Sequence, residues 1–212
     1  MSTKDYYKNY WQNKIKCGIV SSPPEWTEEN LVWHHTFFKN YIGKRVLDVG
    51  GGDGTLLDFL SKNLNLREMV VCDISKEAVT AGKKKYTDLE FKVGDACDLS
   101  FSKKSLDTIL AVEFLEHVLD VDKCLSEISR VLRRGGHLCV TTTDFNLLKR
   151  VAIGLFFWDK FFYPNNPHIR FFTKKTLEDI VQKHGFKQVD YKWNRSYFGL
   201  MPKGQMAVFK RV

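Results

Sequence analysis

Cysteine, proline and long apolar runs are all scarce in this chain of 212 residues. Its five cysteines are odd in number and scattered, with no C-x-x-C pair, which argues against a disulfide scaffold or a zinc site. No window approaches the ~18 apolar residues of a membrane span, and the first residues lack the apolar core of a signal peptide. We therefore expect one cytoplasmic domain with reduced, buried thiols.

Positive charge is concentrated in the last third of the chain, although the net charge is only +8. Residues 145–212 carry thirteen basic and four acidic groups (net +9), whereas residues 46–144 carry thirteen and seventeen (net −4). An anionic substrate or a membrane surface would explain this excess. Solubility explains it equally well, and both interpretations stay open.

The stretch of residues 44–60 has the pattern of a nucleotide site. Apolar residues over 46–49 predict a buried strand, and the residues from Thr55 onward predict a helix. The glycines at 50, 51, 52 and 54 let the backbone turn sharply and approach a ligand, because no Cβ stands in the way. Together these parts predict a nucleotide-sized site at a helix N-terminus.

The remaining chain alternates strand and helix patterns. We expect strands at 45–49, 69–74, 89–94, 106–113 and 137–143, and helices at 26–41, 55–64, 75–86 and 120–132, the last of them ended by residues 133–136. This alternation predicts a parallel sheet with helices on both faces. A helix that begins at Thr173, with Phe172 and Leu177 as a hydrophobic staple, then precedes an antiparallel hairpin of strands at 186–193 and 205–211.

The glycine spacing separates two classes of nucleotide site. The dinucleotide fingerprint G-x-G-x-x-G is not met, because its third glycine would fall on Thr55. The chain instead reads acid-x-G-x-G-x-G, with Asp48, Gly50, Gly52 and Gly54. This resembles motif I of the class I S-adenosylmethionine-dependent methyltransferases. The resemblance extends from residue 44 to the end and implies an α/β fold, with a Rossmann-like seven-stranded mostly parallel sheet, helices on both faces and an antiparallel C-terminal hairpin.

Further motifs follow in the order that the resemblance implies. Asp73 ends the second strand, where an acid can accept hydrogen bonds from ribose hydroxyls. Asp95 and Ala96 are similar to the segment that holds the adenine amine, and the segment AVEFLEHV is similar to the one beneath the methionine part. The resemblance implies S-adenosylmethionine as cofactor and S-adenosylhomocysteine as product. The cofactor-binding residues it implies are Asp48, Gly50, Gly52, Asp73, Ile74, Asp95, Ala96 and Glu113.

Within that class the chain resembles the small-molecule methyltransferases (type 11/12) that include the ubiquinone-biosynthesis O-methyltransferases, through E-F-L-E-H-V at 113–118. The same E-x-x-E-H form resembles the metal-binding segment of the small-RNA 2′-O-methyltransferases and of some quinone methyltransferases. Glu113, Glu116 and His117 could approach one hard cation, because i and i+3 share a helix face. Many members of the family use E-H here only to cap a helix and line the cleft, and we expect no metal.

Methyl transfer from a sulfonium needs alignment and a dry site rather than a protein nucleophile. A hydroxyl acceptor must also lose a proton, and a histidine with a near-neutral pKa suits that task. His117, at the end of the fourth strand, and His168, after the insertion, are the candidate catalytic bases, although a lone histidine is more often structural. Trp158, His168 and Arg170 are candidate substrate contacts.

An aromatic insertion at 145–163 is the most individual part of the sequence. Its residues Leu148, Val151, Leu155, Trp158 and Phe162 lie at helical spacing. Three interpretations are open: a helix packed over the sheet edge or at a dimer contact, a lid over an apolar acceptor, and an element that inserts shallowly into a membrane surface.

We therefore expect one methyltransferase domain in four parts: an N-terminal helical lid (1–42), a cofactor-binding core (43–144), the insertion or substrate lid (145–172), and a C-terminal helix with its hairpin (173–212). The expected reaction is methylation of a small or lipid-like acceptor, with oxygen favoured. The alternative is a non-catalytic cofactor-binding subunit or regulator that acts with a partner protein. An RNA methyltransferase is disfavoured because no RNA-binding module is visible. We expect no nucleic-acid partner, peripheral contact with a membrane, and a monomer or homodimer.

Overall fold

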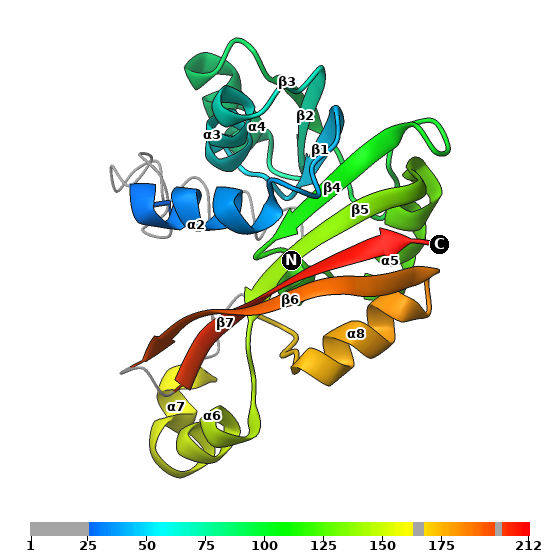
Figure 1. Ribbon diagram of the computed structural model, residues 1–212. Helices are drawn as coiled ribbons and strands as arrows, with labels where there is room; N and C mark the ends of the chain where they lie inside the picture. Colours follow the sequence, from blue (N-terminus) through cyan, green and yellow to red (C-terminus); the bar gives the residue numbers. More distant parts are fainter. Residues whose placement is uncertain (1–25, 163–167, 198–200) are drawn as a thin grey trace.

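The computed structural model describes residues 26–162, 168–197 and 201–212 (Figure 1). Within these residues a seven-stranded sheet has the order β3-β2-β1-β4-β5-β7-β6. The strands β1 (Arg45–Val49), β2 (Glu68–Asp73), β3 (Glu90–Val93), β4 (Leu106–Val112) and β5 (Leu132–Thr143) are parallel. The strands β6 (Phe186–Tyr197) and β7 (Met201–Arg211) are antiparallel, with β7 between β5 and β6. The predicted α/β fold class is confirmed.

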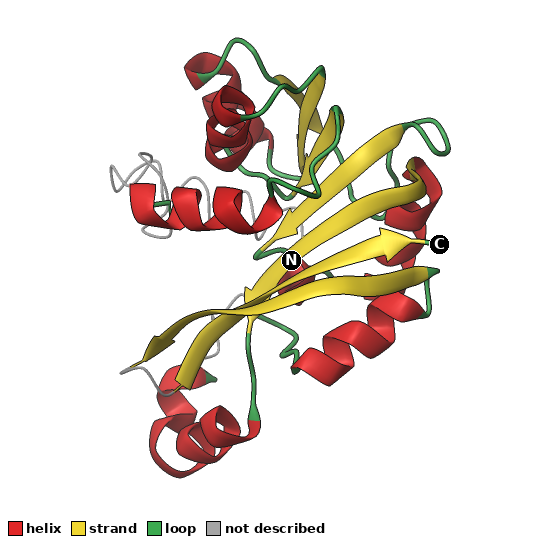
Figure 2. Cartoon of the chain, viewed as in Figure 1, coloured by secondary structure: helices red, strands yellow, loops and turns green. Residues whose placement is uncertain are grey.

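Helices cover both faces of the sheet (Figure 2). On one face lie α2 (Glu28–Phe38), α3 (Thr55–Asn63) and α4 (Lys76–Lys85), and on the other α5 (Val121–Val131) and α8 (Lys174–Gln182). Each face has its own apolar core, which includes Phe38 and Leu57 on the first and Leu125 and Val181 on the second. Burial of these faces against the sheet is the main source of stability in such a layered fold.

The helix starts are encoded by capping side chains. Thr27, Ser75, Asp120 and Thr173 each accept the backbone N–H three residues further on, an interaction worth about 1 kcal/mol per helix. The predicted helix start at Thr173 is therefore confirmed, and Thr27 caps the helix predicted at 26–41. Phe172 and Leu177 are both buried in the second core, as a hydrophobic staple requires.

The fifth strand starts earlier than its pattern predicts. The helix α5 ends at Val131 and β5 begins at the next residue, so residues 133–136 belong to the strand, and their prediction as a helix end is wrong. The register against β4 shifts here, which marks a bulge. Gly135 has a φ of 75°, a conformation that helix-ending and bulge glycines share. Asp107 of β4 holds the bulge by accepting from Arg133 Nε at 2.6 Å.

The closing hairpin is also longer than predicted. Pro202 and Gly204, which we expected in the connecting loop, lie within β7, and β6 continues to Tyr197 rather than ending near 193. Residues 1–25 of the predicted N-terminal helical lid lie outside the described residues. None of the described helices has both the length and the apolar character needed to cross a membrane.

The aromatic insertion forms a broken helix rather than a continuous one. It consists of α6 (Leu147–Ala152), a π-helical turn η2 (Ile153–Phe157) and α7 (Trp158–Phe161). Four residues of the predicted stripe are exposed, namely Leu148, Val151, Leu155 and Trp158. A helix packed over the sheet edge through this stripe is therefore not what the structure contains.

Candidate active site

The glycine turn joins β1 to α3 at the carboxyl edge of the sheet. Gly50, Gly52 and Gly54 have φ values of 69°, 58° and 80°, which side chains other than glycine rarely adopt. The turn is held by the N–H of Gly50, which donates to the carbonyl of Cys72 at 2.8 Å. A Cβ at Gly50 would lie 2.3 Å from the ring of Phe114. Glycine is thus required there by packing as well as by conformation.

Two buried carboxyl groups lie beside this turn. Asp73, the last residue of β2, accepts from the N–H of Gly52 at 3.0 Å and from the N–H of Ser75 at 2.8 Å. Burial raises the pKa of Asp73 to about 6, although these two hydrogen bonds oppose the shift. Burial, and then the charge of Asp73, raises the pKa of Asp48 to about 8. Asp48 is therefore mostly protonated at neutral pH and can ionise beside a cation.

The other predicted cofactor residues follow neighbouring strand ends at the same edge. Ile74 follows β2 and is half-buried, whereas Asp95 and Ala96 follow β3 and are exposed and half-buried. Asp95 Oδ1 accepts from the N–H of Cys97 at 2.8 Å, which orders this loop. The chain order of the sheet reverses between β1 and β4, where ligands of open α/β sheets bind.

These residues fit the expected cofactor. Each oxygen of Asp73 accepts one backbone N–H and retains a lone pair that a ribose hydroxyl could use. The glycine turn has no Cβ to block the approach of a ligand. Asp48 provides a buried acid of raised pKa, which a cationic methionine part would help to ionise. The donor and acceptor set therefore suits the adenosine and methionine parts of S-adenosylmethionine.

Glu113 has an uncommon backbone conformation directly after β4, with a φ of 47°. Its N–H donates to the carbonyl of Thr141 at 2.9 Å, and the hydroxyl of Thr141 donates to its Oε1 at 2.9 Å. Thr141 belongs to β5, so the neighbouring strand holds this strained residue. Strain of this kind is typical of functional sites.

His117 and His168, the two candidate bases, lie against each other. His117 ends the short helix η1 (Leu115–His117), and its ring centroid lies 4.8 Å from that of His168 in an edge-on arrangement. The loop is held there because the N–H groups of Ile169 and Arg170 donate to the carbonyl of Glu116 at 3.0 and 3.2 Å. Burial, followed by His117 and Lys149, lowers the pKa of His168 to about 4. His168 is thus neutral at pH 7.

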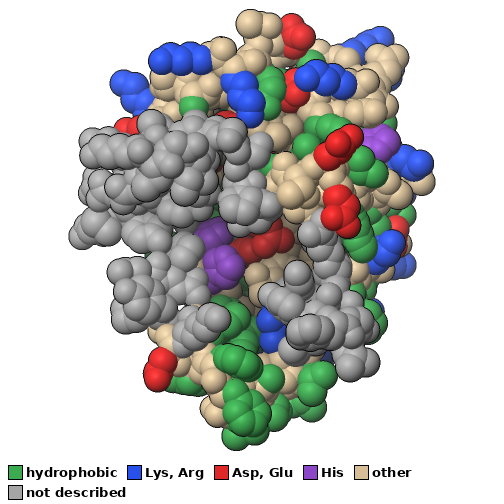
Figure 3. Space-filling model, turned by 90° about the vertical axis from the view of Figure 1, so that its left-hand side faces the viewer, with side chains coloured by type: hydrophobic (Ala, Val, Ile, Leu, Met, Phe, Trp, Pro, Cys, Tyr) green, Lys and Arg blue, Asp and Glu red, His purple; other side chains and the backbone are tan. Residues whose placement is uncertain are grey.

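Glu116 joins the two histidines in what we call the histidine–glutamate cluster (Glu116, His117, His168). One ligand-type atom from each residue lies within 4.8 Å of the other two. Glu116 is fully buried, and in the described residues neither carboxyl oxygen has a hydrogen-bond partner. Burial, and then Glu113, raises its pKa well above the usual range. Figure 3 shows histidine and acidic side chains together in a hollow of the surface. Glu113 itself is outside the cluster.

Lys149 is the functional candidate that the sequence patterns missed. It lies on α6, within the insertion, yet it is buried. Burial lowers its pKa, while Asp144 and Glu113 oppose that shift. Lys149 also depresses the pKa of His168, so its ammonium group acts on the histidine–glutamate cluster. A cation in an amphipathic pattern normally indicates a solvated face, and only the fold brings this one inside.

The predicted substrate contacts separate in the structure. The guanidinium of Arg170 is half-buried and donates to the carbonyl of Leu119. Its backbone lies against Glu116, so Arg170 and His168 both belong to the surroundings of the cluster. Trp158 is instead exposed on α7, where its ring contacts Phe162 at 4.4 Å. Trp158 thus belongs to the outer surface of the insertion.

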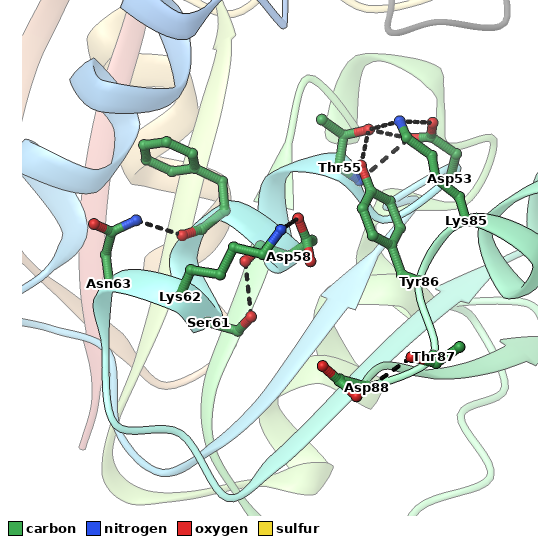
Figure 4. A network of polar contacts seen from close by, with 11 residues as sticks. Asp53, Thr55, Asp58, Ser61, Lys62, Asn63, Lys85, Tyr86, Thr87 and Asp88 are labelled. Carbon is green, nitrogen blue, oxygen red and sulfur yellow. Dashed lines mark hydrogen bonds and ion pairs between the residues drawn. The ribbon is translucent and has the colours of Figure 1, made fainter.

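A polar network holds the turn from the side of α4 (Figure 4). Asp53 is buried and accepts from the hydroxyl of Thr55 at 2.7 Å. Lys85, at the end of α4, donates to Asp53 Oδ2 at 3.2 Å and to the hydroxyl of Thr55 at 3.1 Å. The hydroxyl of Tyr86 lies 3.2 Å from that of Thr55. The network joins the start of α3 to the end of α4 and thereby supports the glycine turn that precedes α3.

Known proteins resemble this chain in sequence and in fold. A family model described as a methyltransferase domain matches residues 47–140. The demethylmenaquinone methyltransferase of Bacteroides fragilis is 26% identical over 208 residues, which cover 88% of this chain and 81% of that protein. The fatty-acid O-methyltransferase of Mycolicibacterium smegmatis is 35% identical over 101 residues, which cover 47% of this chain and 37% of that protein.

A solved structure from Thermotoga maritima has the same fold. It is described as an S-adenosylmethionine-dependent methyltransferase and possible histamine N-methyltransferase. The match covers 100% of both chains with a TM-score of 0.71, at 18% sequence identity. At this identity the likeness concerns the fold alone.

Proposed function

Because the chain belongs to the class I S-adenosylmethionine-dependent methyltransferases, we propose that it methylates a hydroxyl oxygen of a small, lipid-like molecule. S-adenosylmethionine is its cofactor and supplies an electrophilic methyl group on a sulfonium sulfur. Two relatives support the acceptor class, since by their names one acts on demethylmenaquinone and the other on a fatty acid at oxygen.

We assign the cofactor to the carboxyl edge of β1, β2 and β3. Asp73 would hold the ribose hydroxyls, and Asp95 with Ala96 would hold the adenine. Asp48 would support the turn or bind the cationic methionine part, which Gly50 and Gly52 allow to come close. Ile74 and Glu113 would flank the two ends of the cofactor. The support for these roles is the set of donors and acceptors that the strand ends bring to this edge.

The contact between His117 and His168 is the observation that carries the proposal for oxygen. When the acceptor oxygen bonds to the methyl carbon, the carbon–sulfur bond breaks and the hydroxyl proton must leave. A neutral imidazole can accept that proton. His168 is neutral because burial lowers its pKa to about 4, and the same shift makes it a weaker base than a histidine of ordinary pKa. The second ring, 4.8 Å away, is placed to share or relay the proton. Methylation of an amine that is already neutral would need no such base.

Transfer of labelled methyl groups tests this proposal. The purified chain is incubated with methyl-labelled S-adenosylmethionine and a lipid extract of cells, and the labelled product is identified by mass spectrometry. His117→Ala and His168→Ala should each lower turnover by about 100-fold with unchanged cofactor affinity. The matched control is His184→Ala, because His184 contacts Ser126 and Asp122 instead of the cluster. Label on nitrogen or carbon would contradict the choice of oxygen.

A divalent cation at the histidine–glutamate cluster is the second candidate for activating the hydroxyl. It is favoured by the buried carboxyl of Glu116, whose oxygens have no hydrogen-bond partner in the described residues, and by two imidazoles with ligand atoms within 4.8 Å. A bound cation would lower the pKa of an acceptor hydroxyl directly. Metal analysis of protein purified without chelator tests this candidate. One equivalent of metal that Glu116→Gln abolishes would support it, and unchanged turnover after chelation would contradict it.

The non-catalytic alternative makes a different prediction in the same assay. A cofactor-binding subunit or regulator would bind S-adenosylmethionine tightly and label nothing until its partner protein is added. Light scattering after size exclusion would distinguish the monomer from the homodimer.

We further propose a cytoplasmic location, supported by the unpaired thiols Cys72, Cys97, Cys124 and Cys139. Fractionation of cells that express a tagged chain would test it.

A further inference from the structure

Residues 147–158 expose a concentration of apolar side chains. Half of the exposed large apolar residues in the described chain lie within this segment. Single exposed apolar residues are normal on a protein surface, but a group of this size indicates an interaction site. We call the group the apolar tip, and its six most exposed members are between 52% and 74% exposed: Leu147, Leu148, Leu155, Phe156, Phe157 and Trp158.

The apolar tip stands on a firm base. Figure 1 shows α6 and α7 below the sheet, and Figure 3 shows hydrophobic side chains gathered at the same lower end of the molecule. The base is an aromatic cluster in which Phe171 contacts Phe145, Phe161 and Phe162, with ring centroids 4.9, 5.7 and 5.3 Å apart. The inner rings therefore hold the segment together. Of the outer rings, Trp158 contacts Phe162 of this base, whereas Phe156 and Phe157 contact each other.

We propose that the apolar tip docks on an anionic lipid bilayer. Leucine, phenylalanine and tryptophan are the residue types that insert at the boundary between headgroups and acyl chains. The segment is far shorter than the ~20 residues of a spanning helix, so the insertion is shallow. Figure 1 shows it as a projection from the body, which suits a deformable lipid surface.

Charge decides between a bilayer and a second copy of this chain. Near the apolar tip, the exposed cations Arg150, Lys174 and Lys175 lie on α6 and at the start of α8, against one exposed acid, Asp159, on α7. Two such regions placed face to face would repel each other. Anionic headgroups attract them, by about 1 kcal/mol for each basic residue near the surface.

Docking would bring the candidate active site to the bilayer, an inference that rests on the proposed lipid-like acceptor. The base of the segment begins at Asp144, which is buried and bridges to Phe172. Lys149 of α6 acts on His168 in the histidine–glutamate cluster. Lys149 directly follows Leu148 of the apolar tip on α6, so this helix connects the tip with the surroundings of the cluster. An apolar acceptor could then pass from the bilayer to the cleft with little exposure to water.

Sedimentation with vesicles tests the docking proposal on the full chain. Vesicles are made of phosphatidylcholine alone, or of phosphatidylcholine and phosphatidylglycerol in equal parts. We expect the wild type to sediment with the anionic vesicles and Phe156→Ser/Phe157→Ser to lose about tenfold or more in partitioning. The matched control, Val32→Ser/Val212→Ser, removes exposed apolar groups elsewhere and should sediment like the wild type. Wild type that stays in solution, or a tip variant that sediments equally, would overturn the proposal.

Two further measurements separate docking from the proposed function and from self-association. With a detergent-dispersed acceptor, the tip variant should transfer methyl groups like the wild type, and only transfer to a vesicle-embedded acceptor should fall. If no acceptor is ever methylated while sedimentation still depends on the tip, docking stands and the proposed function fails. A wild-type dimer that the tip variant turns into a monomer, without vesicle binding, would overturn docking in favour of a second copy.

Discussion

The glycine turn and the apolar tip are unfavourable for folding in opposite ways. Around the turn, Asp48 and Asp73 are carboxyl groups buried at strand ends, and their raised pKa values reflect the free energy that burial costs. At the tip, Phe156 and Phe157 are large apolar side chains exposed to water. Neither the buried carboxyl groups nor the exposed apolar side chains stabilise the folded chain by themselves. Each therefore indicates a ligand outside the chain: a polar cofactor for the turn and an apolar surface for the tip.

The two regions also differ in how tightly their backbones are constrained. At Gly50 an added Cβ would collide with the ring of Phe114, whereas at Gly154 in η2 nothing lies within 4 Å. A cofactor with one shape requires a single backbone geometry, and a fluid surface requires only exposed apolar area. The glycine turn therefore has to be rigid to bind its cofactor, whereas the apolar tip does not have to be rigid to contact a membrane.

Alanine at these two glycines should have the largest effect on stability and tests the difference in rigidity directly. Gly50→Ala combines a positive φ with a contact of 2.3 Å and should lower the free energy of unfolding by about 2–4 kcal/mol. Gly154→Ala should raise it by up to about 1 kcal/mol, because the unfolded chain loses freedom. Urea unfolding measures both. Equal effects would contradict the difference in rigidity.

Asp73→Asn should weaken cofactor binding by about 10- to 100-fold, or about 1.4–2.7 kcal/mol. The amide that replaces one carboxyl oxygen cannot accept from the N–H groups of Gly52 and Ser75 and also serve two ribose hydroxyls. Titration calorimetry with S-adenosylmethionine measures the change. Asp179→Asn on the exposed surface of α8 is the control, and Phe156→Ser/Phe157→Ser should bind the cofactor normally. An unchanged affinity for Asp73→Asn would remove this residue from the site.

The buried carboxyl group of Asp48 should make stability depend on pH. The unfolded carboxyl ionises near pH 4, whereas burial raises the pKa of Asp48 in the folded chain to about 8. Between these pH values the folded chain binds a proton at Asp48 that the unfolded chain has lost. The stabilisation from this proton is fully present below about pH 4, and it is lost as the pH rises towards 8. Linkage puts this decline at about 1.4 kcal/mol for each pH unit between the two pKa values. Asp48→Asn should remove most of it in urea unfolding. Parallel curves for the two proteins would refute the shift.

Lys85→Ala should have the smallest effect of these changes. The lysine is half-exposed, so its ion pair with Asp53 is weakened by solvent, and we expect a loss of about 0.5 kcal/mol in unfolding free energy. Lys76→Ala on the same helix, whose side chain is exposed, should change nothing measurable. A double-mutant cycle with Asp53→Ala would isolate the pair. A coupling energy above about 1 kcal/mol, the upper end for exposed pairs, would contradict the expected screening by solvent.

Local patterns were sufficient to predict the elements of the sheet and the caps of its helices. Buried strands are continuous apolar runs, and residues such as Thr173 and Thr27 satisfy helix N–H groups within one turn of the chain. The glycine turn was predictable as well, because the positive φ angles at Gly50, Gly52 and Gly54 are a local property of the backbone. The prediction was wrong at residues 133–136, because Gly135 in a bulge has the conformation of a glycine that ends a helix.

The candidate site could be predicted only residue by residue and not as an arrangement. Sequence spacing does not contain the contact of His117 with His168, which depends on the two N–H groups that bind the carbonyl of Glu116. The burial of Lys149 is likewise absent from the sequence pattern, in which it directly follows the exposed Leu148. The helical stripe in the insertion left three interpretations open, because periodicity shows only that a face is apolar, and the structure exposes four of its residues.

The place of β7 in the sheet has a consequence for how the protein is made. In the described sheet this strand is buried along residues 204–209 and links β5 to β6, yet it is synthesised after every other strand. A nascent chain that still lacks β7 therefore has β5 as an open edge and β6 without a neighbour. A premature stop codon just before this strand would leave that edge open to other chains. The eleven residues of β7 thus decide whether the edge of β5 is covered in the described sheet.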